Sequence, residues 1–148
     1  MDFFVGFLSP LLVMVGWFFV YRNSNRIAKR SETYSLVTKA LDKVLDVDRR
    51  CVEYWCGSAE KREASEAWIS GTLAQIYGIR SLLEILEKYH GFSDKDMVLM
   101  RLRMSSTLHA EDISDIGSQL VAERRAKQSE AMSYALHSLY SYYREICD

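Results

Sequence analysis

One short segment of this chain, residues 100–109, concentrates side chains that suit a phosphate-bearing ligand. Its sequence, MRLRMSSTLH, combines two arginines, three hydroxyls and a histidine with apolar residues. A guanidinium binds phosphate through a planar fork, hydroxyls donate hydrogen bonds to phosphate or ribose oxygens, and an imidazole or phenol ring stacks on a base. A ligand with several phosphates and bases would use this mixture. The candidate ligand-binding residues are Arg101, Arg103, Ser105, Ser106, Thr107 and His109.

The two arginines of this segment are two positions apart. On one helix their side chains therefore diverge by about 200°, so they cannot hold the same phosphate. We expect one of them to face a ligand and the other to face an acid on a neighbouring helix. The alternative is an amphipathic helix whose arginines lie at the edge of its apolar face, and the residue types leave both interpretations open.

The rest of the sequence lacks the spacing patterns of catalytic sites. It contains no Gly-rich phosphate loop, no HExxH motif and no nucleophile elbow. The three histidines are far apart, and none lies near a cysteine at the spacing of zinc ligands. We therefore expect a protein that is not an enzyme and that uses neither a metal nor another cofactor.

The N-terminal segment differs from everything after it, because residues 3–21 contain no charge. Roughly 20 apolar residues in a helix cross a hydrocarbon core about 30 Å thick. A cleaved signal peptide would begin with bases and end at small residues, whereas Asp2 is acidic and Arg22 follows the run directly. A buried core helix would be shorter and polar on one face. We expect a transmembrane helix over residues 1–22.

Four cations fix the expected orientation of this helix. Arg22, Arg26, Lys29 and Arg30 follow the apolar run, and no Lys or Arg precedes it. The positive-inside rule then places the N-terminus outside and the remaining chain in the cytoplasm, with the basic cluster beside anionic head groups. We expect a single-pass protein of the cell inner membrane.

The three cysteines agree with a reducing compartment. Cys51, Cys56 and Cys147 are odd in number and have no spacing typical of a disulfide or a metal site. We expect reduced thiols that pack inside the fold.

Residues 23–148 are long enough for one small domain, and their composition predicts an all-α fold. The one proline of the chain lies in the apolar run, so few residues interrupt a helix in this domain. Apolar residues at steps of three and four predict a bundle of about four helices, the first of which continues directly from the span. The expected ranges are 24–55, 59–90, 94–108 and 114–146.

Glycines and short polar residues mark the expected helix ends. We predict that Gly57 ends the first helix as a left-handed C-cap and that Ser58 begins the second as its N-cap. Gly91 is expected to stop the second helix. Ser93 and Asp94 are expected to cap the third, with acids in its first turn.

The last predicted helix contains a polar middle and a tyrosine-rich end. Residues 122–130 are strongly polar, which is typical of a solvated face. Tyr140 and Tyr143 lie on one face of the helix and Tyr142 on another, so at least one should lie outside the core of a single chain. We expect subunit contact there, with base stacking as the lesser alternative.

These parts are compatible with three functions. A membrane effector would bind a signal with its helical domain and rearrange its spans. A static anchor or adaptor would dock another protein on the same domain. A holin-like or antiholin-like phage protein would also have a short span, although this cytoplasmic domain is large for that class.

The order of the parts resembles the small membrane effectors that accompany type III CRISPR systems. The resemblance rests on the apolar run 3–21, the basic flank 22–30 and the segment 101–109, and it covers the layout of the whole chain. It implies a homotetramer that binds cyclic tetra-adenylate, a cyclic oligonucleotide, and disrupts the inner membrane during antiviral defence. Duplex nucleic acid is not an expected partner.

Overall fold

The structure, a computed structural model, describes residues 2–58, 60, 62–111 and 117–147, with side chains described from residue 10 to residue 146 of these ranges. The described residues are almost all helical and contain no β-strand, which confirms the all-α prediction. The helices are α1 (Asp2–Cys56), α2 (Ser65–Ile85), the π-helical turn η2 (Leu86–His90), α3 (Lys95–Thr107) and α4 (Ser118–Cys147).

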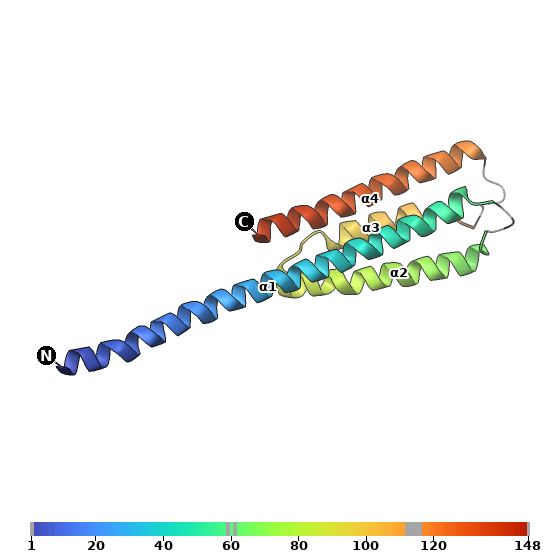
Figure 1. Cartoon of the computed structure of the whole chain (residues 1–148). Coiled ribbons are helices and arrows are strands. Elements are labelled where there is room, and N and C mark those ends of the chain that lie inside the picture. The colour runs from blue at the N-terminus through green and yellow to red at the C-terminus, as the bar shows by residue number, and fades with distance from the viewer. Residues whose placement is uncertain (1, 59, 61, 112–116, 148) are drawn as a thin grey trace.

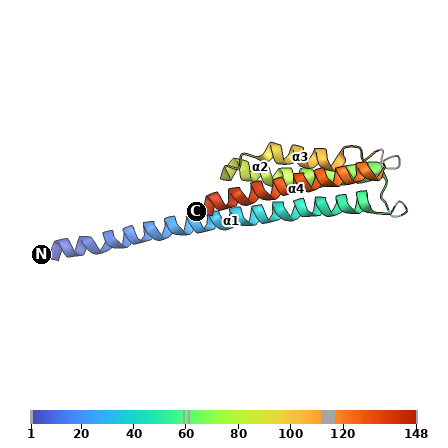
Figure 2. The ribbon, with the colours of Figure 1, turned by 90° about the horizontal axis from the view of Figure 1, so that it is seen from above.

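The helices form an up-and-down four-helix bundle (Figure 1). The C-terminal half of α1 packs against α2 and α4, and α3 packs against the same two helices from the opposite side. Viewed from above, α1 extends far beyond the other helices at its N-terminal end (Figure 2). The predicted bundle of about four helices is therefore confirmed.

The buried residues of α1 show where the bundle begins. Thr33 is the first buried side chain among those described, and buried residues then recur every three or four positions up to Trp55. Because α1 is unbroken from Asp2 to Cys56, the expected continuous helix between the apolar run and the domain is confirmed.

The apolar side chains near the N-terminus of α1 have no partner helix in the bundle. The large apolar residues from Leu11 to Tyr21 are between 45% and 74% exposed. The side chains of residues 2–9, which include the first part of the predicted span, lie outside the described residues. Within the described part of the chain, no helix is both long and apolar enough to cross a bilayer.

The prediction for Gly57 is wrong, whereas that for Gly91 is confirmed. Gly91 is left-handed (φ 85°) and ends η2, and Gly57 is not among the described residues with positive φ. A Cβ on Gly57 would clash with the carbonyl oxygen of Glu53. Close approach of the backbone, rather than left-handed geometry, therefore explains this glycine.

The second helix begins later than predicted, so Ser58 is not its N-cap. α2 starts at Ser65, and its N-cap position is taken by Ala64, which makes no side-chain capping bond. Instead, Arg62 donates from Nε to the carbonyl of Tyr54 (3.0 Å) and from Nη2 to that of Gly57 (3.1 Å). The guanidinium satisfies carbonyls at the end of α1, and this holds the linker away from helical geometry.

The start of α3 is confirmed, but its capping is not. Asp94 occupies the N-cap position and makes no capping bond. Its carboxylate instead accepts hydrogen bonds from Tyr134 (3.0 Å) and Ser138 (2.8 Å) of α4. The acid therefore joins two helices.

The prediction of a solvated middle for the last helix is wrong at two positions. Arg124 and Gln128 are buried. They lie on the same face of α4 as the buried residues Ala131, Ala135 and Leu139. α4 begins at Ser118. The predicted start near residue 114 lies outside the described residues.

The cysteine prediction holds in part. Cys51 is fully buried, and burial raises the pKa of its thiol to about 11. Cys56 is exposed, so the packing prediction is wrong there. The side chain of Cys147 lies outside the described residues.

Candidate ligand-binding site

α3 distributes the candidate residues over three directions. Arg103 lies between α2 and α3, and Arg101 faces α4. Ser105 and Ser106 are buried in the bundle. The prediction that the two arginines diverge is confirmed, because they line different pockets.

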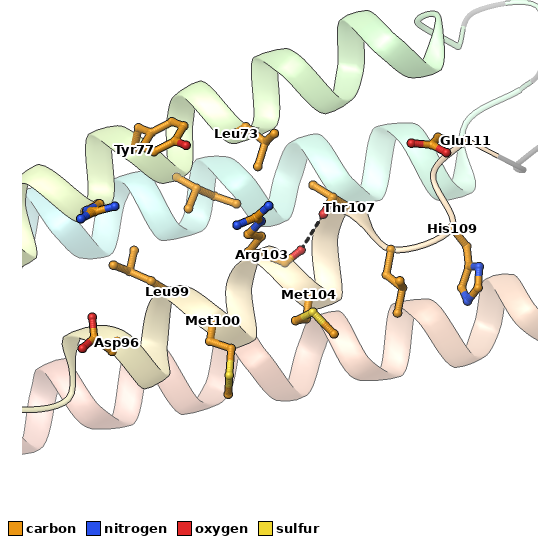
Figure 3. Close-up of a pocket in the computed structure, with 13 residues that line it drawn as sticks. Leu73, Tyr77, Asp96, Leu99, Met100, Arg103, Met104, Thr107, His109 and Glu111 are labelled. Atoms are coloured by element: carbon orange, nitrogen blue, oxygen red, sulfur yellow. Dashed lines mark hydrogen bonds between the residues drawn. The ribbon is translucent and has the colours of Figure 1, made fainter.

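The larger pocket, here called the α2–α3 groove, has a volume of about 710 Å³. This size is within the range of small-molecule sites. Figure 3 shows Arg103 in its centre, with Leu73 and Tyr77 on the α2 side. Further lining residues are Ile76, Arg80, Asp96, Leu99, Met100, Met104, Thr107, Leu108, His109 and Glu111.

Arg103 is the cation of the groove that is available to a ligand. Its guanidinium is exposed and has no ion pair or hydrogen bond with any residue that the structure describes. Its backbone carbonyl accepts a hydrogen bond from the Thr107 hydroxyl (2.9 Å). A guanidinium with five free donors suits a phosphate oxygen pair.

The second cation of the groove, Arg80, is already engaged. It donates from Nε to Glu84 (2.8 Å), and this hydrogen bond holds the pKa of the Glu84 carboxyl below its usual value. Asp96 and Glu111 add negative charge to the lining. The groove is therefore of mixed charge, and its attraction for an anion comes mainly from Arg103.

Tyr77 supplies a flat aromatic surface beside Arg103. Its side chain is 61% exposed. A phenol ring in this position can stack on a base, and such stacking tolerates any base. Tyr77 was not among the predicted site residues, although Leu73, Tyr77 and Arg80 follow the helical spacing of a single face.

Arg101 faces α4 and meets both an acid and an aromatic ring. Its Nη1 lies 3.6 Å from Glu130 Oε1, and its guanidinium carbon lies 4.3 Å from the centre of the Tyr134 ring. The expectation that one arginine faces an acid on a neighbouring helix is confirmed.

Ser105 and Ser106 use their hydroxyls within the protein. Both donate to the carbonyl of Leu102, at 3.2 and 2.7 Å, and Ser106 also approaches Gln128 Oε1 at 3.1 Å. Ser106 is fully buried and reaches neither pocket, whereas Ser105 lines the smaller one. Ser106 therefore has no access to the ligand that was expected there.

His109 marks the end of α3. It is left-handed (φ 62°), is exposed and lines the α2–α3 groove. Histidine is one of the residues enriched among non-glycine positions of this kind. Its place at the groove agrees with the sequence prediction, while its role towards a ligand stays a prediction.

A smaller pocket, the α3–α4 pocket, lies between α3 and α4 next to the groove and has a volume of about 260 Å³. Its cations are Arg101, Arg124 and Lys127, and its acid is Glu130. Arg124 and Lys127 were not among the predicted site residues, because the polar run around them is typical of a solvated face. Extending the three- and four-residue spacing back from Leu139 would have reached Arg124.

The tyrosine-rich end packs mostly within the chain. Tyr142 donates to the carbonyl of His90 (2.8 Å), and the Tyr143 ring lies 5.4 Å from that of Tyr34. Tyr140 is exposed, as expected for at least one of the three.

No cluster of three or more metal-binding side chains occurs in the part of the chain that the structure describes. Comparison with known protein families, with curated proteins and with solved structures finds no match. Function therefore has to be inferred from the geometry of the long helix and the two pockets.

Proposed function

We propose that this protein is a membrane-anchored, non-enzymatic effector of antiviral defence. Its apolar N-terminal segment crosses the inner membrane, and its cytoplasmic bundle binds a cyclic oligonucleotide in the α2–α3 groove. Ligand binding rearranges the attached spans and perturbs or permeabilises the membrane. The ligand is cyclic tetra-adenylate, as the resemblance to the effectors of type III CRISPR systems implies.

The membrane anchor is supported by the outer part of α1. Large apolar side chains with no partner in the bundle are unfavourable in water, and residues 3–21 carry no charge. The exposed cations Arg22, Arg26, Lys29 and Arg30 follow at once. An apolar run followed by cations is typical of a transmembrane helix that leaves the bilayer on its cytoplasmic side.

The observation that carries the ligand assignment is the unpaired guanidinium of Arg103 beside the exposed ring of Tyr77. One phosphate contact and one stacking surface are what a single nucleotide unit requires. In a homotetramer, four grooves around a fourfold axis would offer one such set to each unit of a four-nucleotide ring. The ligand shifts the equilibrium between two arrangements of the spans only as far as it binds one arrangement more tightly than the other.

Calorimetric titration of cyclic tetra-adenylate into the full-length chain in an uncharged detergent tests this proposal. Arg103→Ala and Tyr77→Ala should each weaken binding at least about 100-fold, because a charged hydrogen bond or a stacked base contributes about 1–3 kcal/mol and each ligand would lose four such contacts. The expected stoichiometry is one ligand per four chains.

Arg49→Ala is the matched control, since Arg49 is exposed and pairs with Asp46 away from the groove (2.7 Å). This variant should bind as the wild type does. Equal effects of all three substitutions, or no binding by the wild type, would contradict the assignment.

A second candidate is an adaptor that docks a protein partner in the same groove. Met100 and Met104 are 53% and 54% exposed there, and flexible thioethers are common on protein-binding surfaces. The adaptor predicts a captured protein and no nucleotide affinity, so a pull-down beside the titration separates the two candidates.

A further inference from the structure

Arg124 is the most unusual charged residue of the bundle. Its side chain is only 4% exposed, and its Nε is buried without a hydrogen-bond partner. No residue that the structure describes forms an ion pair with it. The next residue, Arg125, does pair with an acid, Asp48 of α1 (3.3 Å).

Burying an unpaired cation costs free energy. Arginine is almost never fully buried unless it is paired, because the charge loses its hydration. Such a group is stable where an opposite charge reaches it. Arg124 therefore points to an anion that is part of the working protein.

The surroundings of Arg124 offer room and further positive charge. It lines the α3–α4 pocket with Arg101 and Lys127, against the single acid Glu130. Glu130 is largely exposed and lies 3.6 Å from Arg101, and Lys127 pairs with Glu123 outside the lining (2.6 Å). Ser105 adds a buried hydroxyl. The lining carries three cations and one acid, so its net charge favours an anion.

We propose that the α3–α4 pocket is a binding site for a phosphate group, with Arg124 as its central ligand. A tetrahedral oxyanion can accept from a guanidinium fork and from neighbouring donors at once. A volume of about 260 Å³ admits a phosphate together with part of the molecule that carries it. This site lies between α3 and α4, beside the groove assigned to the cyclic oligonucleotide, with which it shares Met104 and Leu108 in its lining, and it does not depend on that assignment.

With the apolar run in the membrane, as proposed above, the source is a soluble phosphate rather than a lipid head group. The neighbouring ion pair between Arg125 and Asp48 places the pocket near the C-terminal end of α1. At about 1.5 Å per residue, Asp48 is about 40 Å along the helix from Arg22, where the apolar run ends. The two remaining sources are inorganic phosphate and the phosphate group of a nucleotide, which the pocket would recognise through the same chemistry.

Thermal unfolding of the full-length chain in an uncharged detergent provides the test. Sodium phosphate replaces sodium chloride at constant pH and ionic strength. The midpoint of the wild type should rise by about 5 °C or more at a hundred times the half-saturating concentration. In Arg124→Met this rise should disappear, whereas Arg125→Met should keep it whatever its own midpoint.

Phosphate also stabilises proteins generally, as a salt, and this effect acts alike on the wild type and both variants. Comparing the three therefore removes it. Without phosphate, Arg124→Met should unfold no earlier than the wild type, because an apolar side chain replaces an unpaired charge. If that variant does not fold, Arg101→Gln serves instead and should raise the half-saturating concentration at least threefold.

A parallel titration with adenosine 5′-monophosphate distinguishes the sources. Half-saturation at a lower concentration than with phosphate assigns a nucleotide, and half-saturation at the same or a higher concentration assigns inorganic phosphate. A wild type that responds to phosphate no more than Arg124→Met overturns the site.

Discussion

At the scale of single residues, Tyr142 shows how one hydroxyl joins the end of the bundle. It donates to the carbonyl of His90, and its ring meets Phe92 edge-on at 5.1 Å. His90 Nδ1 in turn lies 2.8 Å from Thr33 Oγ1, which donates to the carbonyl of Lys29 (2.9 Å). The Thr33 hydroxyl and His90 Nδ1 therefore form a hydrogen bond between α1 and η2. α4, η2 and α1 are thereby linked where α1 leaves the bundle.

Tyr142 gives a prediction for alkaline stability. Burial raises the pKa of its hydroxyl to about 12 in the folded chain, against about 10 in an unfolded one. Above pH 10 the unfolded state therefore loses a proton that the folded state keeps, so stability falls as pH rises towards 12. Urea unfolding should show a steeper loss between pH 10 and 12 for the wild type than for Tyr142→Phe.

At pH 7 Tyr142→Phe should be about 1 kcal/mol less stable than the wild type, because it lacks the hydrogen bond to the carbonyl of His90. Tyr140→Phe is the control, because its hydroxyl is on an exposed side chain and makes no such bond. A Tyr142→Phe slope that matches the wild type would exclude Tyr142 as a source of the pH dependence.

The same scale shows what residue types do and do not predict. The divergence of Arg101 and Arg103 followed from helical geometry alone and was confirmed. The burial of Ser106 and Arg124 depends on how α3 and α4 are rotated against each other. For Ser106 no pattern in the sequence contains that rotation, whereas steps of three and four residues lead back from Leu139 to Arg124 on the buried face of α4.

At the scale of elements, apolar spacing predicted the helices better than their ends. The four ranges were close because each helix buries a continuous stripe. The error at the start of α2 arose because Arg62, from the linker itself, binds the carbonyls at the end of α1. A capping pattern such as that at Ser58 considers only the residue at the helix start and therefore does not reveal this contact.

The continuity of α1 carries the proposed coupling and gives the next prediction. Asn25 is exposed and lies before Thr33, where burial begins. Asn25→Pro should break the helix there at a cost of about 3 kcal/mol, all of it outside the bundle. Ligand affinity should be unchanged, whereas ligand-triggered leakage of a dye from vesicles that contain the protein should be lost.

Asn25→Ala is the matched control and should keep both activities, since alanine favours the helix. Leakage that persists in Asn25→Pro would mean that the span responds to the ligand without a rigid connection.

At the scale of the whole molecule, the chain has a packed bundle and a helical extension that leaves it. A core of buried apolar residues holds the four helices together, while the outer part of α1 presents apolar side chains with no partner in the bundle. The all-α fold and the continuous helix were predictable because composition and spacing determine them. The two pockets were not, because each forms only where α3 packs against a second helix, α2 for the groove and α4 for the smaller pocket.

Membrane insertion is the claim on which effector and anchor both depend, and fractionation of cells that express the full-length chain with a C-terminal fluorescent reporter tests it most directly. The account predicts that the protein stays in the membrane pellet after an alkaline carbonate wash. The reporter should fluoresce, as it does only when it folds in the cytoplasm. Recovery of the protein in the supernatant, or a reporter that is dark while a periplasmic enzyme fusion at the same end is active, would contradict the account.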